Sequence, residues 1–240
     1  MFSSRRRAAP FIVRVLGVAV FVLLVGLGTW QLQRSAWKRD LIARVAERVA
    51  TSPAPAPGPA SWSRLTAGAD EYRTVFATGT FSHDRETHVR AVTALGGGTW
   101  VLTPFRTDDG FTVLVNRGFV PPERRDPASR QDGQIVGTTR VTGLLRFTEP
   151  FGAFLQANDP ASDLWVSRDV AAIAAARGLV DGVAPYFIDS GRTPGPGDAP
   201  VGGLTVVAFA NNHLLYALVW YTLAAMLAGA AFVHRARRTR

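Results

Sequence analysis

Two apolar segments, one near each end of the chain, constrain the fold more than any other feature. They cover residues 11–30 and 214–233. Each holds about 20 mostly apolar residues, which is the length an α-helix needs to cross a bilayer. No other segment qualifies. The residues between the two predicted transmembrane helices are therefore expected to lie together on one side of a membrane.

Charge at the two ends predicts the orientation. Eight arginines and no acidic residue precede or enter the first apolar segment or follow the second: Arg5, Arg6, Arg7, Arg14, Arg235, Arg237, Arg238 and Arg240. Because flanking Lys and Arg stay on the cytoplasmic side, residues 1–10 and 234–240 are both predicted to be cytoplasmic. Basic residues at 34, 38, 39 and 44 argue the other way, but the two terminal flanks agree with each other.

These arginines also explain the basic composition. The net charge is +9, and the remaining 19 basic and 18 acidic residues nearly cancel. The charge therefore indicates topology, and no nucleic-acid partner is expected. No A-x-A-like cleavage site follows the first apolar segment, which disfavours a signal peptide. Trp30 fits an aromatic anchor at the outer membrane interface.

The chain has no cysteine. This excludes disulfides, thiol redox chemistry and thiolate metal transfer. No nucleophile–base constellation or phosphate-binding loop is visible either, so an enzyme is not expected.

Residues 31–210 are predicted to form the extracytoplasmic domain. Apolar residues at helical spacing predict an amphipathic stalk over 35–50, and the Pro/Ala-rich stretch 51–60 predicts an extended spacer without a core of its own. Residues 61–210 contain strand-like runs separated by turn residues. The predicted fold class is an α+β membrane protein: a two-helix transmembrane hairpin encloses a mostly antiparallel β domain with one or two helices.

Local patterns place the elements of this domain. A helix is expected over 167–177, with Ser167 as its cap. The glycines at 96–98 indicate a break, and 121–134 and 191–200 indicate irregular loops. Strands are expected at 72–81, 87–94, 99–106, 111–116, 135–147, 186–189 and 204–209.

Few residues of the domain suggest chemistry. His83 and His88 are five residues apart, which places them on opposite faces of a strand, so a shared metal is not expected. Both are expected to be exposed polar residues. Arg117, after a strand, could hold a carboxylate of a partner or a propionate. From spacing alone, an arginine that bonds the backbone carbonyls of a loop is the favoured interpretation.

The start of the second predicted helix, 211–233, is more unusual. Asn211 and Asn212 precede His213, and His213, Tyr216 and Trp220 fall on one helical face. A neutral imidazole is a common axial ligand of heme iron, and the aromatic rings could pack against a porphyrin. The alternative is an interfacial cap with an aromatic belt.

Four blocks of the sequence resemble a known family. GTWQLQRSAWKRDLI (28–42), EYRTVFATGTF (71–81), VLVNRGFVP (113–121) and NNHLLYALVWYTLAA (211–225) resemble the blocks of the Surfeit locus protein one family, in the family's order. Together with the two-helix topology they span nearly the whole chain. By this resemblance the chain is identified as a member of that family.

The resemblance implies an assembly factor of heme-copper cytochrome c oxidase. Such a factor helps heme a reach subunit I or stabilises subunit I in the respiratory chain complex. His213 matches the family's proposed heme ligand. The other matching motif residues are Trp30, Gln31, Arg34, Asn116, Arg117, Gly118, Asn211 and Asn212. An alanine- and arginine-rich composition fits a high-GC bacterium, so a multi-pass protein of the bacterial plasma membrane is expected.

Two functional classes remain open. The first is a heme-handling chaperone in which His213 contacts heme a transiently, Tyr216 and Trp220 shield the macrocycle, and Arg117 or Arg34 pairs with a propionate. The second is a scaffold or accessory subunit that binds no heme. Its helices would dock on subunit I through small residues. The candidates are Gly17, Gly26, Ala224, Ala225 and Ala228.

Overall fold

The computed structural model describes residues 5–151, 156–180, 182–191, 199–205 and 211–239. The chain divides into two compact units. The helical unit comprises Met1–Arg44 and Ala208–Arg240, and the sheet unit comprises Val45–Val207. The unit boundaries therefore fall inside the predicted 31–210 domain at one end and close to its limit at the other.

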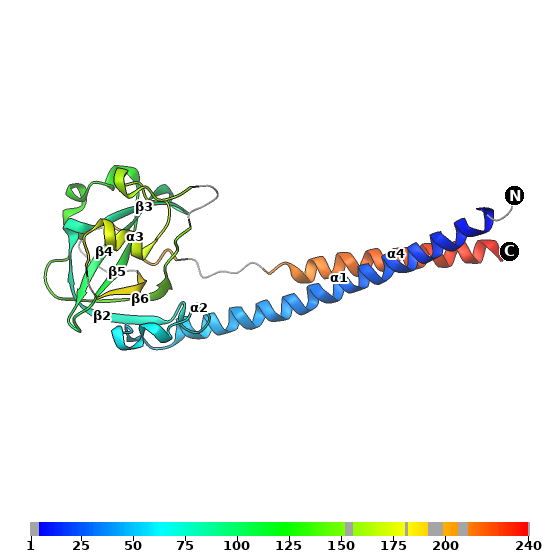
Figure 1. Cartoon of the computed structure of the whole chain (residues 1–240), viewed down its shortest axis with the longest axis horizontal. Coiled ribbons are helices and arrows are strands. Elements are labelled where there is room, and N and C mark those ends of the chain that lie inside the picture. The colour runs from blue at the N-terminus through cyan, green and yellow to red at the C-terminus, as the bar shows by residue number, and fades with distance from the viewer. Residues whose placement is uncertain (1–4, 152–155, 181, 192–198, 206–210, 240) are drawn as a thin grey trace. The chain divides into compact units, whose positions relative to one another are not determined.

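Two long helices make up the helical unit. Helix α1 covers Arg5–Ala50 without interruption, and α4 covers His213–Arg238. The segments Ile12–Ala50 and His213–Arg237 are long and apolar enough to cross a membrane. Helix α1 includes residues 35–50, which the sequence predicts as a helical stalk. The two helices lie side by side (Figure 1).

Small residues allow the two helices to approach closely. Gly28, Ala217 and Ala224 are buried, and a Cβ atom on Gly28 would lie 2.9 Å from the ring of Tyr221. The Thr29 hydroxyl hydrogen-bonds the Tyr221 hydroxyl at 3.0 Å. Large apolar residues elsewhere on both helices are exposed: Ile12, Leu16, Val22, Leu23, Leu215, Leu218 and Met226. An apolar outer surface around a small-residue seam is the pattern of helices packed in a bilayer.

A seven-stranded sheet forms the sheet unit. The strands are β1 (Ala54–Pro55), β2 (Thr74–Phe81), β3 (Thr87–Thr93), β4 (Gly96–Thr107), β5 (Thr112–Val120), β6 (Thr139–Phe147) and β7 (Val183–Ser190). Their order is β1-β2-β6-β7-β5-β4-β3, and an additional pairing of β2 with β4 closes a ring of five strands. Five pairings are antiparallel, while β1–β2 and β5–β7 are parallel.

Short helices connect the strands (Figure 1). They are η1 (Pro59–Arg64), α2 (Ala67–Asp70), η2 (His83–Arg85), η3 (Pro122–Arg124), η4 (Pro127–Gly133), η5 (Pro160–Ser162) and α3 (Val170–Ala176). The confirmed part of the predicted fold class is therefore an α+β chain in which two apolar helices flank a sheet domain.

Alternation along the strands places the core on both faces of the sheet. One cluster holds Val113, Val115, Leu145, Tyr186 and Ile188. A second holds the intervening Leu114 and Phe187, with Trp165 and with Ile173 of α3. A small third cluster holds Val101, Val120 and Ala199. Successive strand residues point to opposite faces, and both faces of β5 are covered. This explains why every residue of β5 is buried.

The Pro/Ala stretch 51–60 is not a free spacer. Ala54–Pro55 pair with β2, the amide of Ala56 donates to Phe76 O at 2.8 Å, and Ala56 joins the core. Proline cannot donate to a sheet ladder and so is found at edge strands. A Pro/Ala stretch is therefore compatible with this edge position, which its composition did not indicate.

Other local predictions are also corrected. Gly96–Gly98 belong to β4, and the turn lies one step earlier, at residues 94 and 95. Asp169, not Ser167, caps α3 by accepting from the Ala172 amide. Of the strand expected at 204–209, Leu204 and Thr205 are not in a strand, and the rest lies outside the described residues. The 121–134 segment contains η3 and η4, and most of 191–200 is outside the described residues.

Candidate functional site

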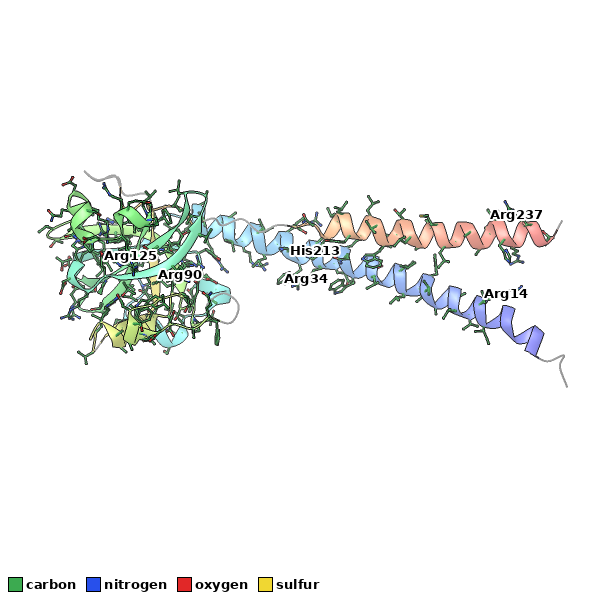
Figure 2. The ribbon with its side chains drawn as sticks, turned by 90° about the horizontal axis from the view of Figure 1, so that it is seen from above. Arg14, Arg34, Arg90, Arg125, His213 and Arg237 are labelled. Atoms are coloured by element: carbon green, nitrogen blue, oxygen red, sulfur yellow. The ribbon has the colours of Figure 1, made fainter. Side chains whose placement is uncertain are left out.

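His213 is the first residue of α4 (Figure 2). The helix begins here because Asn211 and Asn212 interrupt the apolar pattern. Asn212 occupies the N-cap position but makes no side-chain cap hydrogen bond. The first turn of a helix has backbone N–H groups without intrahelical partners. His213 therefore lies at the polar end of an otherwise apolar helix.

Gln31 on α1 is the hydrogen-bond partner of His213. Its Oε1 lies 2.7 Å from Nδ1 of the imidazole. An amide oxygen only accepts hydrogen bonds, so this contact is a hydrogen bond in the tautomer that carries the proton on Nδ1. In that tautomer Nε2 has the free lone pair, and no described residue hydrogen-bonds to Nε2. A neutral imidazole with a free Nε2 is the form that ligates iron.

Several buried polar atoms on the described segments that carry Gln31 and His213 have no hydrogen-bond partner. The Asn211 side chain donates to Ser35 O at 3.3 Å, but Asn211 Oδ1 has no partner. Among the described residues, the buried Ser35 Oγ and the Trp220 Nε1 are likewise unpaired. Buried polar groups are normally hydrogen-bonded. These groups therefore have unused bonding capacity on the segments that carry Gln31 and His213.

The aromatic residues do not form one buried face with His213. Tyr216 is 54% exposed, and Trp220 is half-buried. The positions of α4 that contact α1 or are buried include His213, Ala217, Tyr221 and Ala224. Trp30 is also exposed. Tyr216 thus lies on the outer flank of the helix pair, next to the first turn of α4.

Arg34 provides a positive charge on the same segment of α1. Its guanidinium lies 4.0 Å from the ring centroid of Trp37, and its side chain is exposed (Figure 2). Among the described residues, no carboxylate pairs with it. Arg34 is accordingly available to an anion.

The Asn116-Arg117-Gly118 motif lies within β5 of the sheet unit, not after a strand as the sequence predicts, and the register of the pairing with β4 shifts beside it. Asn116 donates to Asp189 Oδ1 at 2.6 Å and accepts from the Gly118 amide at 3.2 Å. Gly118 has φ of +130° and lies against the backbone of Val201. Only glycine readily adopts this φ. Asn116 and Gly118 therefore shape the irregular middle of β5.

Arg117 is buried and anchors a loop. It donates to the carbonyl of Gly133 and to His83 Nδ1, the latter at 3.4 Å, and it lies 5.2 Å from the Phe81 ring centroid. Burial lowers the pKa of Arg117 to about 10, which leaves it protonated at neutral pH. This is the loop-bonding arrangement that spacing favoured. Among the described residues, Arg117 bonds no carboxylate.

His83 and His88 are half-buried, so the prediction that they are exposed is wrong. His83 Nε2 lies 2.9 Å from Ile135 O, and His88 Nε2 lies 3.0 Å from Glu86 Oε1. The fully buried Arg130 also pairs with Glu86. Within the described residues, no group of three or more potential metal ligands is present.

A second buried ionic cluster could not be found from the sequence. Asp189 accepts from Arg146 and Arg168, which also bond Glu149. These residues come from β6, β7 and the segment before α3. No local motif in the sequence predicts that these residues meet. Of the residues that contact Asp189, only Asn116 belongs to a motif that the sequence marks.

These observations define a class of protein: a β domain flanked by two helices that could each cross a membrane, with an imidazole in the first turn of the second helix. A sequence model of the SURF1 family matches residues 18–225. Surfeit locus protein 1 of Homo sapiens is 39% identical over 222 residues, covering 85% of this chain and 71% of the relative.

Other relatives agree. The SURF1-like protein of Monosiga brevicollis is 38% identical over 224 residues, covering 87% of this chain and 82% of the relative. The SURF1-like protein of Drosophila melanogaster is 32% identical over 230 residues, covering 85% and 73%. The chain belongs to the SURF1 family.

Proposed function

We propose that this protein is a membrane-anchored assembly factor of heme-copper cytochrome c oxidase that assists the delivery of heme a to subunit I or its retention there. Both apolar helices cross the membrane in this proposal, and both arginine-flanked termini are cytoplasmic. The membrane would be the plasma membrane of a bacterium. Family membership supports the oxidase.

The observation that carries the heme contact is the state of His213. Its Nδ1 contacts Gln31 Oε1, and no described residue hydrogen-bonds to Nε2, whose lone pair is therefore available to a metal. An iron porphyrin accepts such a nitrogen as an axial ligand. A single imidazole is a limited donor set, which suits a cargo that must leave.

The neighbouring residues fit the rest of a porphyrin. Tyr216 presents an exposed aromatic ring one turn from His213, and Trp220 has an unpaired buried Nε1. Arg34 is exposed and has no carboxylate partner among the described residues, so it can pair with a propionate. Arg117 is less suited to that role because its donors already bond Gly133 and His83.

Visible absorption tests this proposal. The purified protein, co-expressed with the enzymes of heme a synthesis, should show Soret and α bands. His213→Ala should lose them. His234→Ala is the matched control, because His234 lies near the opposite end of α4 and is exposed, and it should keep the bands. A folded wild type that stays colourless would contradict the heme contact.

A scaffold without heme is the second candidate, and the outer helix surfaces favour it. Cβ atoms on Gly17 and Gly26 would meet nothing within 4 Å, and Ala225 and Ala228 are exposed. Ala224 is excluded from such a surface because it is only 3% exposed within the helix pair. Gly26→Leu should then reduce co-purification with subunit I, while His213→Ala should not.

A further inference from the structure

The acceptor beside His213 is a neutral amide supplied by the other helix. Oε1 of Gln31 approaches Nδ1 at 2.7 Å. The position of Gln31 is held by contacts on either side of it along α1. Thr29 bonds Tyr221, and the carbonyl of Ser35 accepts from Asn211. Gln31 is therefore kept next to the imidazole by the packing of the pair.

We propose that Gln31 is a positioning residue that fixes the proton of His213 on Nδ1 and so keeps Nε2 as a neutral electron-pair donor toward an iron porphyrin. The tautomer part rests on the 2.7 Å contact between Gln31 Oε1 and Nδ1, which is a hydrogen bond when Nδ1 carries the proton. The porphyrin part rests on the function proposed above.

The group that accepts the hydrogen bond from Nδ1 affects how strongly Nε2 binds a metal. A carboxylate that accepts from the far nitrogen of a metal-binding imidazole raises the basicity of the ligand. An amide oxygen orients the ring in the same way but adds no negative charge. Gln31 thus makes Nε2 available without strengthening it, which favours release of a cargo over its storage.

Gln33 provides a matched control on the same helix. It has the same side chain, lies two residues further along α1, and is exposed. No hydrogen bond joins it to His213. Gln33→Leu changes the polarity of α1 as much as Gln31→Leu does, but it leaves the imidazole untouched.

The first measurement needs no porphyrin. Nitrogen-15 NMR of the full-length, histidine-labelled protein in detergent reports which ring nitrogen carries the proton, and His213→Ala assigns the signal among the four histidines. Wild type and Gln33→Leu should show His213 protonated on Nδ1. Gln31→Leu should lose that preference, and Gln31→Glu should retain it.

The second measurement is a titration of the same proteins with iron protoporphyrin IX, followed by the Soret band. Gln31→Leu should weaken binding about 10–100-fold, as is usual when the partner of a ligating histidine is removed. Gln31→Glu should bind at least as tightly as wild type, with a lower reduction potential of the iron. Gln33→Leu should match wild type.

The outcomes separate the two proposals. If Gln31→Leu keeps both the Nδ1 proton and wild-type affinity, or if only His213→Ala weakens binding, the role of Gln31 is refuted and the heme contact stands. A wild type with the Nδ1 proton but no porphyrin binding would refute the heme contact and leave the tautomer assignment intact. Gln31→Glu covers the case in which Gln31→Leu fails to fold, since loss of the Nδ1 proton there also refutes the inference.

Discussion

Replacement of Asp189 by asparagine should destabilise the sheet unit strongly. The Asp189 side chain is 2% exposed. It accepts from Asn116 at 2.6 Å, Thr205 at 2.9 Å, Arg146 at 3.2 Å and Arg168 at 3.4 Å. Asparagine keeps one acceptor oxygen, turns the other into a donor, and removes the negative charge between two guanidinium groups.

The expected magnitude follows from what the two arginines retain. Breaking a buried ion pair costs roughly 3–5 kcal/mol. Arg146 keeps Glu149 at 2.7 Å, and Arg168 keeps two bonds to the same carboxylate at 2.9 Å. The loss for Asp189→Asn should therefore lie at the low end, about 3 kcal/mol. For a unit of this size that corresponds to a Tm lower by about 6–12 °C.

Thermal unfolding of the full-length protein in detergent, followed by tryptophan fluorescence, measures this loss. Trp165 is 1% exposed within the sheet unit and reports its unfolding. Asp84→Asn is the control, because the Asp84 side chain is 77% exposed and its pair with Arg85, at 3.7 Å, is worth at most about 1 kcal/mol. If Asp189→Asn lowers the Tm no more than Asp84→Asn does, the buried ionic cluster does not stabilise the unit as argued.

Three further predictions concern the sheet unit, and each is checked by the unfolding free energy. Gly118→Ala should cost about 1–3 kcal/mol from backbone strain alone, because φ is +130°; an unchanged midpoint would contradict this. Burial, and then the charge of Arg117, lowers the pKa of His83 below 6.5. The unfolded state therefore binds a proton that the folded state does not, and stability should fall as pH falls from 6.5 through the folded pKa. His83→Asn should flatten that slope, and an equally steep slope in this variant would refute the assignment. Leu145→Ala should cost about 2–5 kcal/mol because Leu145 is fully buried, whereas Leu95→Ala, at an exposed position, should cost little; equal losses would show that the core is assigned wrongly.

Features set by local sequence were predictable. Apolar length identified the two long helices, and turn residues identified most strands of the sheet. Four short blocks in order predicted the family, and the family model that matches residues 18–225 confirms it. Positions that depend on a distant partner were not predictable. Ala54–Pro55 form a strand only because β2 provides the other half of the pairing, and the Gly96–Gly98 backbone is extended only because β3 pairs with it.

The same limit applies to side chains. The sequence marks Arg117 as a charge after a strand, but only the fold brings the Gly133 carbonyl and His83 to it. Likewise, Gln31 and His213 stand in separate sequence blocks 182 residues apart. Helical periodicity placed Tyr216 beside His213 but could not tell which of them faces the other helix.

The distribution of unpaired polar atoms indicates which unit carries ligand chemistry. In the described part of the sheet unit, the buried arginines are bonded, and the unpaired buried side-chain atoms are the hydroxyls of Thr99 and Thr103. In the helical unit they are Ser35 Oγ, Asn211 Oδ1 and Trp220 Nε1. An unpaired buried polar group costs about 1–3 kcal/mol, so Ser35→Ala, which removes one of these atoms and no described side-chain hydrogen bond, should not destabilise the protein. If Ser35 Oγ serves a ligand, the same substitution should weaken its binding. Substitutions of the hydrogen-bonded ionic residues in the sheet unit should lower its stability. They should affect ligand binding only by reducing the fraction of protein that is folded.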